Sequence, residues 1–237
     1  MLRHKAAAAL QAVLQPLAAI VLGLMVGAVL IALVGEPVIG TYIEMWKGAF
    51  GNLFFTANTF ARATPIILIA LGVSLAFRAG FFNLGAEGQL VLGGLAAAVA
   101  ALHVPGPAPV KLIAAVLAGM AAGGAWSAAA GWLDARFRLN LLITTLLMNY
   151  IAVLFAGFLA AFPMKEQGGS GAAQTAMIAK ELWLPRLVPG ATLHSGFLVA
   201  AALALLLAVF LRRTVKGYEI RMSGSNPLFA VYGGIRR

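Results

Sequence analysis

Five stretches of this 237-residue chain run for 19 residues or more without a charged side chain. A helix that rises 1.5 Å per residue needs about 20 apolar residues to cross the hydrocarbon layer of a membrane. A sixth apolar stretch, residues 63–77, reaches that length only if it continues through Arg78, with the arginine extending to the interface. The pattern predicts an all-α, polytopic transmembrane helix bundle with about six spans, near residues 17–35, 64–82, 88–110, 112–133, 139–162 and 193–211.

Composition supports the membrane class. Hydrophobic residues make up 62% of the chain and charged residues only 10%, and the mean hydropathy is +0.96. A soluble protein of this length needs more polar surface. Lys and Arg outnumber Asp and Glu by 17 to 7, an excess that cytoplasmic loops of membrane proteins carry. We therefore expect contact with membrane lipid and none with nucleic acid.

The positions of the basic residues predict the orientation. With the amino terminus in the cytoplasm, eleven of the 17 Lys and Arg residues lie on the cytoplasmic side, as the positive-inside rule requires. Residues 1–211 would then form the transmembrane region, and residues 212–237 a cytoplasmic segment, so both termini face the cytoplasm. The alternative, a cleaved signal peptide at the amino terminus, fits less well, because a signal core has about 7 to 15 apolar residues.

Aromatic residues mark the segment between the first two spans. Their spacing over residues 36–62 predicts one helix with an aromatic face that lies at the membrane interface. They are Tyr42, Trp46, Phe50, Phe54 and Phe55.

Residues 81–89, between the second and third spans, contain a carboxylate, two amides and two glycines. A charged side chain within the membrane costs roughly 2.5–3.5 kcal/mol, so Glu87 should face a partner helix or a watery cavity. Three roles stay open for Glu87: accepting hydrogen bonds that hold a break between the spans, lining a solute pathway, or proton coupling. The amides Asn83 and Gln89 join it as candidate pathway residues.

A polar stripe runs along the fifth predicted span. It indicates either hydrogen bonds between helices or part of a solute pathway. Its members are Asn140, Thr144, Thr145 and Asn149. Small residues four positions apart, such as Gly119 and Gly123, indicate close packing of helices within the chain or a dimer face.

The segment after the last span contains the signals of a short helix near residues 227–232. Asn226 can cap it, Pro227 fits its first position, and two glycines end it. Its three large apolar side chains would contact either a protein partner or the membrane surface. They are Leu228, Phe229 and Tyr232.

The chain contains no phosphate-binding loop, no metalloprotease or serine-hydrolase motif and no cysteine, and its three histidines are scattered. We therefore expect no catalytic residue, no metal site and no cofactor in this chain. Energy for active transport would come from an ion gradient or from another subunit.

Three motifs in sequence order give the chain a family resemblance. They are residues 82–89 (FNLGAEGQ), residues 143–151 (ITTLLMNYI), and the tail 217–235 with Gly224-x-Asn226-Pro227 and Tyr232-x-Gly234. Together they resemble the permease subunits of bacterial ABC importers. The similarity is greatest to the nucleoside and simple-sugar branch, which is related to the branched-chain amino acid and ribose permeases.

The resemblance implies a multi-pass permease of the bacterial inner membrane that translocates a nucleoside or simple sugar. Its implied partners are a second permease subunit, an extracytoplasmic solute-binding protein and cytoplasmic ATPases, which would bind ATP and magnesium. The chain itself would not be an enzyme. The positions that match the ATPase-coupling segment are Gly224, Asn226, Pro227, Leu228, Phe229 and Tyr232. The alternative is an ion-coupled secondary transporter or channel without ATPase partners.

Two features depart from the family pattern. Members usually carry an acidic residue and small residues just after the Asn-Pro pair, where this chain has residues 228–231 (LFAV). Members also continue with further spans beyond the coupling segment, so we expect this chain to be a truncated or incomplete product.

Overall fold

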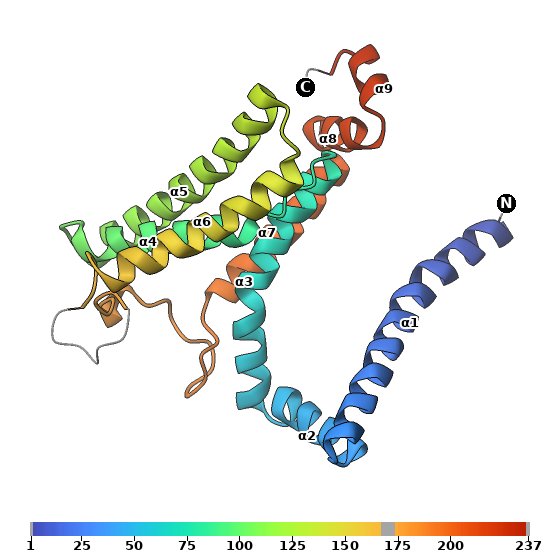
Figure 1. Ribbon diagram of the computed structural model, residues 1–237, viewed down its shortest axis with the longest axis horizontal. Helices are drawn as coiled ribbons and strands as arrows, with labels where there is room; N and C mark the ends of the chain where they lie inside the picture. The colour runs from blue at the N-terminus through green and yellow to red at the C-terminus, as the bar shows by residue number, and fades with distance from the viewer. Residues whose placement is uncertain (1, 167–173, 236–237) are drawn as a thin grey trace. The chain divides into compact units, whose positions relative to one another are not determined.

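The computed structural model describes residues 2–166 and 174–235 (Figure 1). It is 77% helical, and the described residues contain no β-strand. Six of their helices are long and apolar enough to cross a membrane, which confirms the predicted all-α, polytopic class. The elements are α1 (Leu2–Val34), α2 (Val38–Phe50), α3 (Leu53–Arg78), α4 (Ala86–His103), α5 (Ala108–Phe137), α6 (Leu141–Ala161), the 3₁₀ helix η1 (Lys180–Leu182), α7 (Gly196–Arg213), α8 (Val215–Ser225) and α9 (Pro227–Tyr232).

Helix α3 covers a different range from the predicted second span. It begins at Leu53 rather than near residue 64, because the Asn52 Oδ1 atom accepts a hydrogen bond from the Phe55 amide at 2.8 Å and caps the first turn. It ends at Arg78 rather than near residue 82. Gly80 follows with a φ of 86°, a left-handed conformation that glycine adopts without steric strain and that turns the chain out of the helix.

The predicted aromatic segment, residues 36–62, is divided between two helices. Tyr42, Trp46 and Phe50 lie on α2, whereas Phe54 and Phe55 belong to α3. The prediction of a single interfacial helix over residues 36–62 is therefore wrong. Its spacing argument failed because the α2 helix ends at Phe50, and the cap of α3 starts a new helix three residues later.

The chain divides into two compact units. The first comprises the residues up to Phe60 and residues 190–192. Within it α2 packs against α1, and the Tyr42 hydroxyl donates a hydrogen bond to the Leu24 carbonyl. The Thr192 amide and hydroxyl both donate to Asn58 Oδ1, at 2.9 and 2.7 Å. Within this unit, residues 190–192 are therefore hydrogen-bonded to the N-terminal part of α3.

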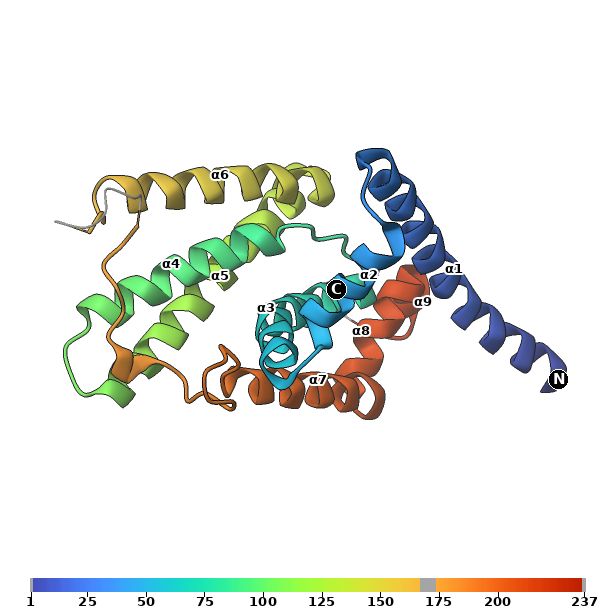
Figure 2. The same ribbon diagram turned by 90° about the horizontal axis from the view of Figure 1, so that it is seen from below.

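The second unit comprises residues 61–189 and 193–237. In it α4 packs against α5 and α6, which also contact each other, and Figure 2 shows α4 next to α5. A Cβ atom on Gly93 would lie 3.0 Å from the Gly119 carbonyl, and one on Gly119 would lie 3.1 Å from the Gly93 carbonyl. The two backbones approach so closely that only glycine fits without a shift. Gly119 of α5 thus serves packing within the chain.

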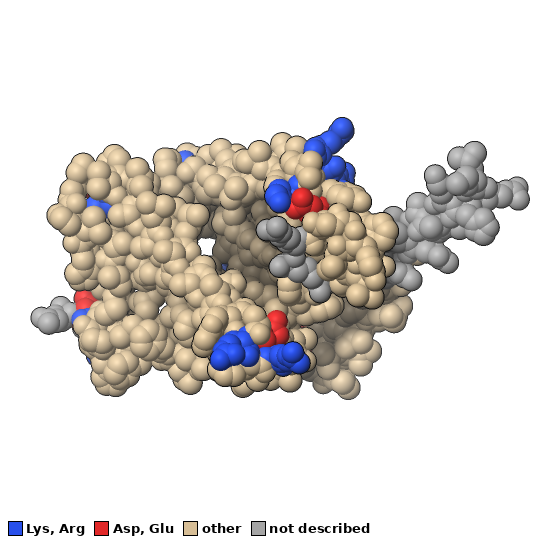
Figure 3. Space-filling view, turned by 90° about the horizontal axis from the view of Figure 1, so that it is seen from above, with Lys and Arg blue, Asp and Glu red and all other residues tan. Residues whose placement is uncertain are grey.

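Large apolar side chains lie mostly on the outside. Met120, Leu154 and Leu205 are 68%, 73% and 68% exposed. Figure 3 shows that Lys, Arg, Asp and Glu side chains on one face gather in a few groups and that other residues make up most of the described surface there. Such a surface is stable only when lipid or other protein covers it, since an apolar area of this extent in water promotes aggregation.

Candidate functional site

The polar block predicted between two spans forms a short non-helical connection followed by the start of α4. The Asn83 side chain accepts a hydrogen bond from the Gly85 amide at 2.7 Å, so it stabilises the turn that leads into the helix. Gly85 precedes the first residue of α4, and Glu87, Gly88 and Gln89 lie in its first turn or just beyond.

Two side chains of α6 hold this connection in place. Asn149 donates from Nδ2 to the Leu84 carbonyl at 2.8 Å and accepts at Oδ1 from the Gly88 amide at 2.9 Å. The Thr145 hydroxyl accepts from the Leu84 amide at 3.2 Å and donates to the Leu142 carbonyl at 3.1 Å. Thr145 is 1% exposed and Asn149 7%. The Leu84 and Gly88 backbone groups that the helix break leaves unpaired are thus satisfied by two buried side chains.

Gly88 lets the connection approach α6 and α5 this closely. A Cβ atom at this position would lie 3.0 Å from Asn149 Oδ1, 3.0 Å from Trp126 Nε1 and 3.1 Å from the Ala152 methyl carbon. The Trp126 indole nitrogen is buried and has no hydrogen-bond acceptor among the described residues. Close packing against α5 and α6 therefore accounts for the glycine at position 88.

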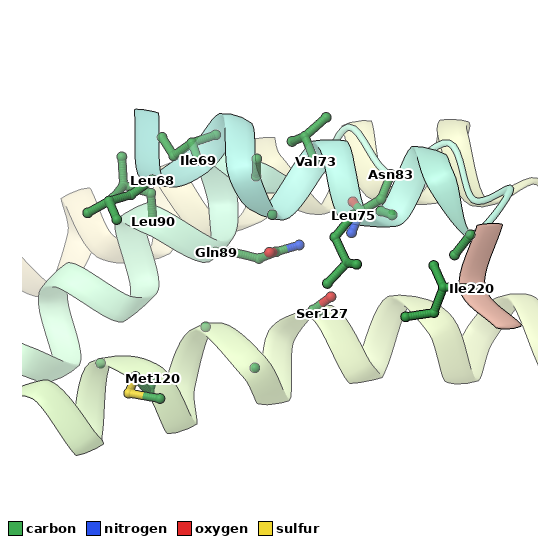
Figure 4. A pocket seen from close by; sticks show the side chains of 17 residues that line it. Leu68, Ile69, Val73, Leu75, Asn83, Gln89, Leu90, Met120, Ser127 and Ile220 are labelled. Atoms are coloured by element: carbon green, nitrogen blue, oxygen red, sulfur yellow. The ribbon is translucent and has the colours of Figure 1, made fainter. Parts of the chain in front are cut away.

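A cavity of about 590 Å³ lies between α3, the start of α4, and α5, with one residue of α8 at its edge (Figure 4). Three side chains bring hydrogen-bonding groups to it: Asn83, Gln89 and Ser127. In Figure 4 Gln89 points from α4 into the open space, and Ser127 points towards the same space from α5. The other described lining residues are apolar or glycine, and none is charged. A volume of 300–1,000 Å³ with a few polar groups on apolar walls is typical of a small-molecule site.

Close helix packing fixes the position of Gln89. A Cβ atom on Gly123 of α5 would lie 3.1 Å from the Gln89 carbonyl oxygen, so the two helix backbones touch at this residue. Gln89 therefore projects into the cavity from a part of α4 that packing against α5 holds in place.

The predicted pathway residues separate into two groups. Asn83 and Gln89 line the cavity. Thr145 and Asn149 hold the connection next to it. Thr144 is buried on α6 and belongs to neither group. Asn140 accepts from the Leu142 amide at 3.0 Å and caps α6. On α6 the polar stripe thus provides a helix cap and hydrogen bonds to the connection.

Glu87 is exposed, does not line the cavity and has no side-chain hydrogen bond or ion pair within the described ranges. Of the three roles left open for Glu87, holding the helix break by accepting hydrogen bonds is therefore not supported by these contacts. Asn149 fulfils that role, because its amide can both donate and accept, whereas a carboxylate only accepts. Ser127 and Ile220, which line the cavity, were not predicted, since neither stands out within its own segment.

The tail forms two consecutive helices at the end of α7. Thr214 caps α8 by accepting from the Gly217 amide at 3.0 Å. A Cβ atom on Gly224 would lie 2.2 Å from the Arg78 carbonyl oxygen and 2.9 Å from the Gly80 nitrogen. Helix α8, which was not predicted, therefore touches the backbone at the end of α3 through Gly224.

Helix α9 begins after Asn226, whose side chain accepts from the Phe229 amide at 3.0 Å. Leu228, Phe229 and Tyr232 are 74%, 57% and 90% exposed. Ala230 is 1% exposed and holds the opposite side of the helix against the chain. The short helix thus presents three large apolar side chains outwards, and the other described residues leave them mostly uncovered.

Residues 55–237 match the family described as the branched-chain amino acid transport system permease component. The chain belongs to this permease family. It is 34% identical to the guanosine ABC transporter permease protein of Bacillus subtilis over 94% of the chain and 64% of the relative. It is 37% identical to the glucose ABC transporter permease protein of Haloferax volcanii, over 95% of the chain and 60% of the relative. It is 30% identical to the nucleoside ABC transporter permease protein of Lactococcus lactis subsp. cremoris, over 94% and 64%.

The permease spans about three fifths of the length of these curated relatives. No solved structure matches the chain. Family membership and the six apolar helices make the permease a multi-pass membrane protein.

Proposed function

We propose that the chain forms part of the permease of an ABC importer that moves an uncharged nucleoside or simple sugar across the bacterial inner membrane. The cavity lined by Asn83, Gln89 and Ser127, with no charged side chain among its described residues, is the observation that carries this proposal. Neutral hydrogen-bonding groups suit solutes rich in hydroxyl and amide groups, whereas a charged solute would need a counter-charge. The relatives named for guanosine, glucose and nucleosides support this class.

Within this proposal Asn83 and Gln89 contact the solute, and Thr145 and Asn149 act by holding the connection that presents them. Thr144 and Glu87 have no place in the cavity wall. Proton coupling through Glu87 therefore has no structural support, because the carboxylate faces neither the cavity nor a titratable partner among the described residues.

Replacing Gln89 with leucine should weaken transport by the complete importer. Removing one hydrogen bond of about 0.5–1.5 kcal/mol lowers the affinity for the solute by roughly threefold to tenfold. Uptake of radiolabelled guanosine and glucose by cells that express the complete transporter, measured over a range of concentrations, would show the change as a raised KM.

Glu87→Gln provides the matched control, because it lies two positions away on α4 and outside the cavity lining. We expect uptake by this variant to equal that of the parent. An unchanged KM for Gln89→Leu would contradict the proposed solute contact, and a loss of uptake with Glu87→Gln would restore proton coupling as a mechanism.

We further propose that α9 docks onto a cytoplasmic ATPase, which binds ATP and magnesium and powers transport. This assignment places both ends of the chain in the cytoplasm. It also includes a second permease subunit and an extracytoplasmic solute-binding protein as partners. The exposure of Leu228, Phe229 and Tyr232 supports it, because apolar groups on a cytoplasmic helix need a partner surface. Gly224, Asn226 and Pro227 would serve by setting the position and the start of this helix.

Replacing both Leu228 and Phe229 with aspartate should prevent the ATPase from copurifying with the complete permease. Two charges in the centre of an apolar interface would have to be desolvated without partners, which disfavours the complex strongly. Affinity purification of the tagged permease, followed by quantification of the ATPase, measures the effect.

Val215→Asp is the control for this experiment. Val215 is 73% exposed, lies at the start of α8 and is outside α9, so the added charge should leave ATPase recovery unchanged. Full recovery of the ATPase with the Leu228→Asp, Phe229→Asp variant would remove α9 from the proposed interface.

The alternative of an ion-coupled transporter or channel is not favoured. The family and the named relatives all belong to ABC transport systems.

A further inference from the structure

A second cavity, of about 400 Å³, lies where α8 meets the end of α3, and Figure 1 shows these two helices next to each other at this point. Its lining comes from Phe77 and Arg78 on α3 and from five residues of α8. The latter are Tyr218, Arg221, Met222, Gly224 and Ser225. This cavity shares no lining residue with the cavity that contains Gln89. Nothing in the proposed transport pathway accounts for it.

Two arginines from different helices meet at this cavity without an acidic partner. Glu219 is the one acidic residue of α8, and it pairs with Lys216 at 2.8 Å rather than with Arg221. Within the described ranges neither Arg78 nor Arg221 forms an ion pair. Arg78 Nε donates a hydrogen bond of 3.5 Å to the Ser74 hydroxyl. The site therefore holds two uncompensated positive charges.

The Arg221 side chain also has an unsatisfied donor. Its Nε atom is buried and has no hydrogen-bond acceptor in the described part of the chain. A buried donor without an acceptor is unfavourable, and a guanidinium group suits the oxygen atoms of a phosphate group in geometry and charge. An anion with several acceptor oxygens would satisfy this donor and neutralise both arginines.

The position of the cavity along α3 indicates which anion reaches it. Phe77 and Arg78 are the last two residues of a helix long enough to span the membrane, so they lie at the depth of the lipid headgroups. In the proposed function, on which this inference rests, this end of α3 faces the cytoplasm. Basic cavities at the cytoplasmic ends of spans bind anionic headgroups, and aromatic rings such as Tyr218 are common at the same depth.

We propose that Arg78 and Arg221 bind a phosphate group, supplied by an anionic phospholipid of the inner membrane. The bound phosphate bridges Arg78 at the end of α3 and Arg221 on α8. It reinforces the backbone contact of Gly224 with Arg78 and thereby fixes the position from which α9 projects.

Native mass spectrometry of the purified chain in mild detergent, titrated with phosphatidylglycerol or with phosphatidylcholine, tests the proposal. The parent should retain phosphatidylglycerol in preference to phosphatidylcholine. The variant Arg78→Gln, Arg221→Gln should bind phosphatidylglycerol about thirtyfold more weakly, the effect expected from two cations at a lipid headgroup. The control Arg212→Gln, Arg213→Gln loses the same charge from exposed positions at the end of α7 and should bind like the parent.

A competition experiment on the parent protein needs no substitution and distinguishes the source of the phosphate. Inorganic phosphate at millimolar concentration should not displace phosphatidylglycerol, because it lacks the acyl chains that lie against Phe77. Displacement would support the phosphate site but assign it to a soluble anion. Equal binding of the two lipids by the parent, or equal losses in the two double variants, would overturn the proposal. So would a loss of ATPase recovery in Arg78→Gln, Arg221→Gln with unchanged lipid binding, which would indicate a protein partner.

Discussion

Replacing Gly224 with alanine is expected to detach α8 from the end of α3. The added methyl carbon would lie 2.2 Å from the Arg78 carbonyl oxygen, a backbone atom that cannot rotate away as a side chain could. The helices must separate, at a cost of about 3 kcal/mol or more for overpacking at a rigid contact. The thermal midpoint of the purified protein should fall, and limited trypsin digestion should cut at Arg221, which the folded α8 protects.

Gly94→Ala is the matched control for Gly224→Ala. Gly94 lies within α4, and a Cβ atom built there meets no atom within 4 Å. This change should leave the protein as stable as the parent or slightly more stable, because alanine favours the helix over glycine by about 1 kcal/mol. Similar thermal midpoints and digestion patterns for the two variants would contradict the backbone contact of Gly224.

Replacing Asn149 with leucine is expected to release the connection between α3 and α4. The leucine keeps a similar volume but removes the acceptor of the Gly88 amide and the donor to the Leu84 carbonyl. Each buried backbone group without a partner costs about 1–3 kcal/mol, so the loss of stability should reach about 2–6 kcal/mol. Hydrogen exchange at residues 84–88, together with the thermal midpoint, measures the release.

Two further variants define the specificity of that result. Tyr150→Leu introduces the same side chain at the next position, which is 70% exposed, and should leave exchange at Gly88 unchanged. Thr145→Val removes the acceptor of the Leu84 amide and the donor to the Leu142 carbonyl but leaves both hydrogen bonds of Asn149, so it should produce a smaller effect at Gly88. If the Gly88 amide exchanged equally in Asn149→Leu and Tyr150→Leu, Asn149 would not hold the connection.

The helical class could be predicted because it depends on local composition. Five of the apolar runs are long enough by themselves to cross a membrane, and lipid leaves a backbone few alternatives to a helix. Helix ends were harder to predict from the same runs. The charge-free run that predicts the second span begins at residue 63, after Arg62, yet the Asn52 cap starts α3 before that arginine. A capping side chain acts over three residues, whereas a hydropathy window averages over many.

The candidate site could be predicted only in part, since its contacts join distant segments. The polar character of residues 81–89 and 140–149 was visible in the sequence, and both segments belong to the site. Asn149 rather than Glu87 pairs the backbone groups at the helix break, and this pairing depends on a contact between residues 61 apart in the sequence. Ser127 lies among alanines and glycines, and Ile220 belongs to a glycine-containing helix that tertiary packing stabilises. No local pattern distinguishes either residue.

Ile220 has a consequence for how two distant surfaces communicate. This residue forms part of the wall around Asn83 and Gln89, and the helix that carries it is packed directly against α9. A ligand in this cavity and a protein bound to α9 therefore both act on helix α8. Thermodynamic linkage then requires reciprocity: if binding at α9 changes the affinity for a solute by some factor, the solute must change the affinity at α9 by the same factor.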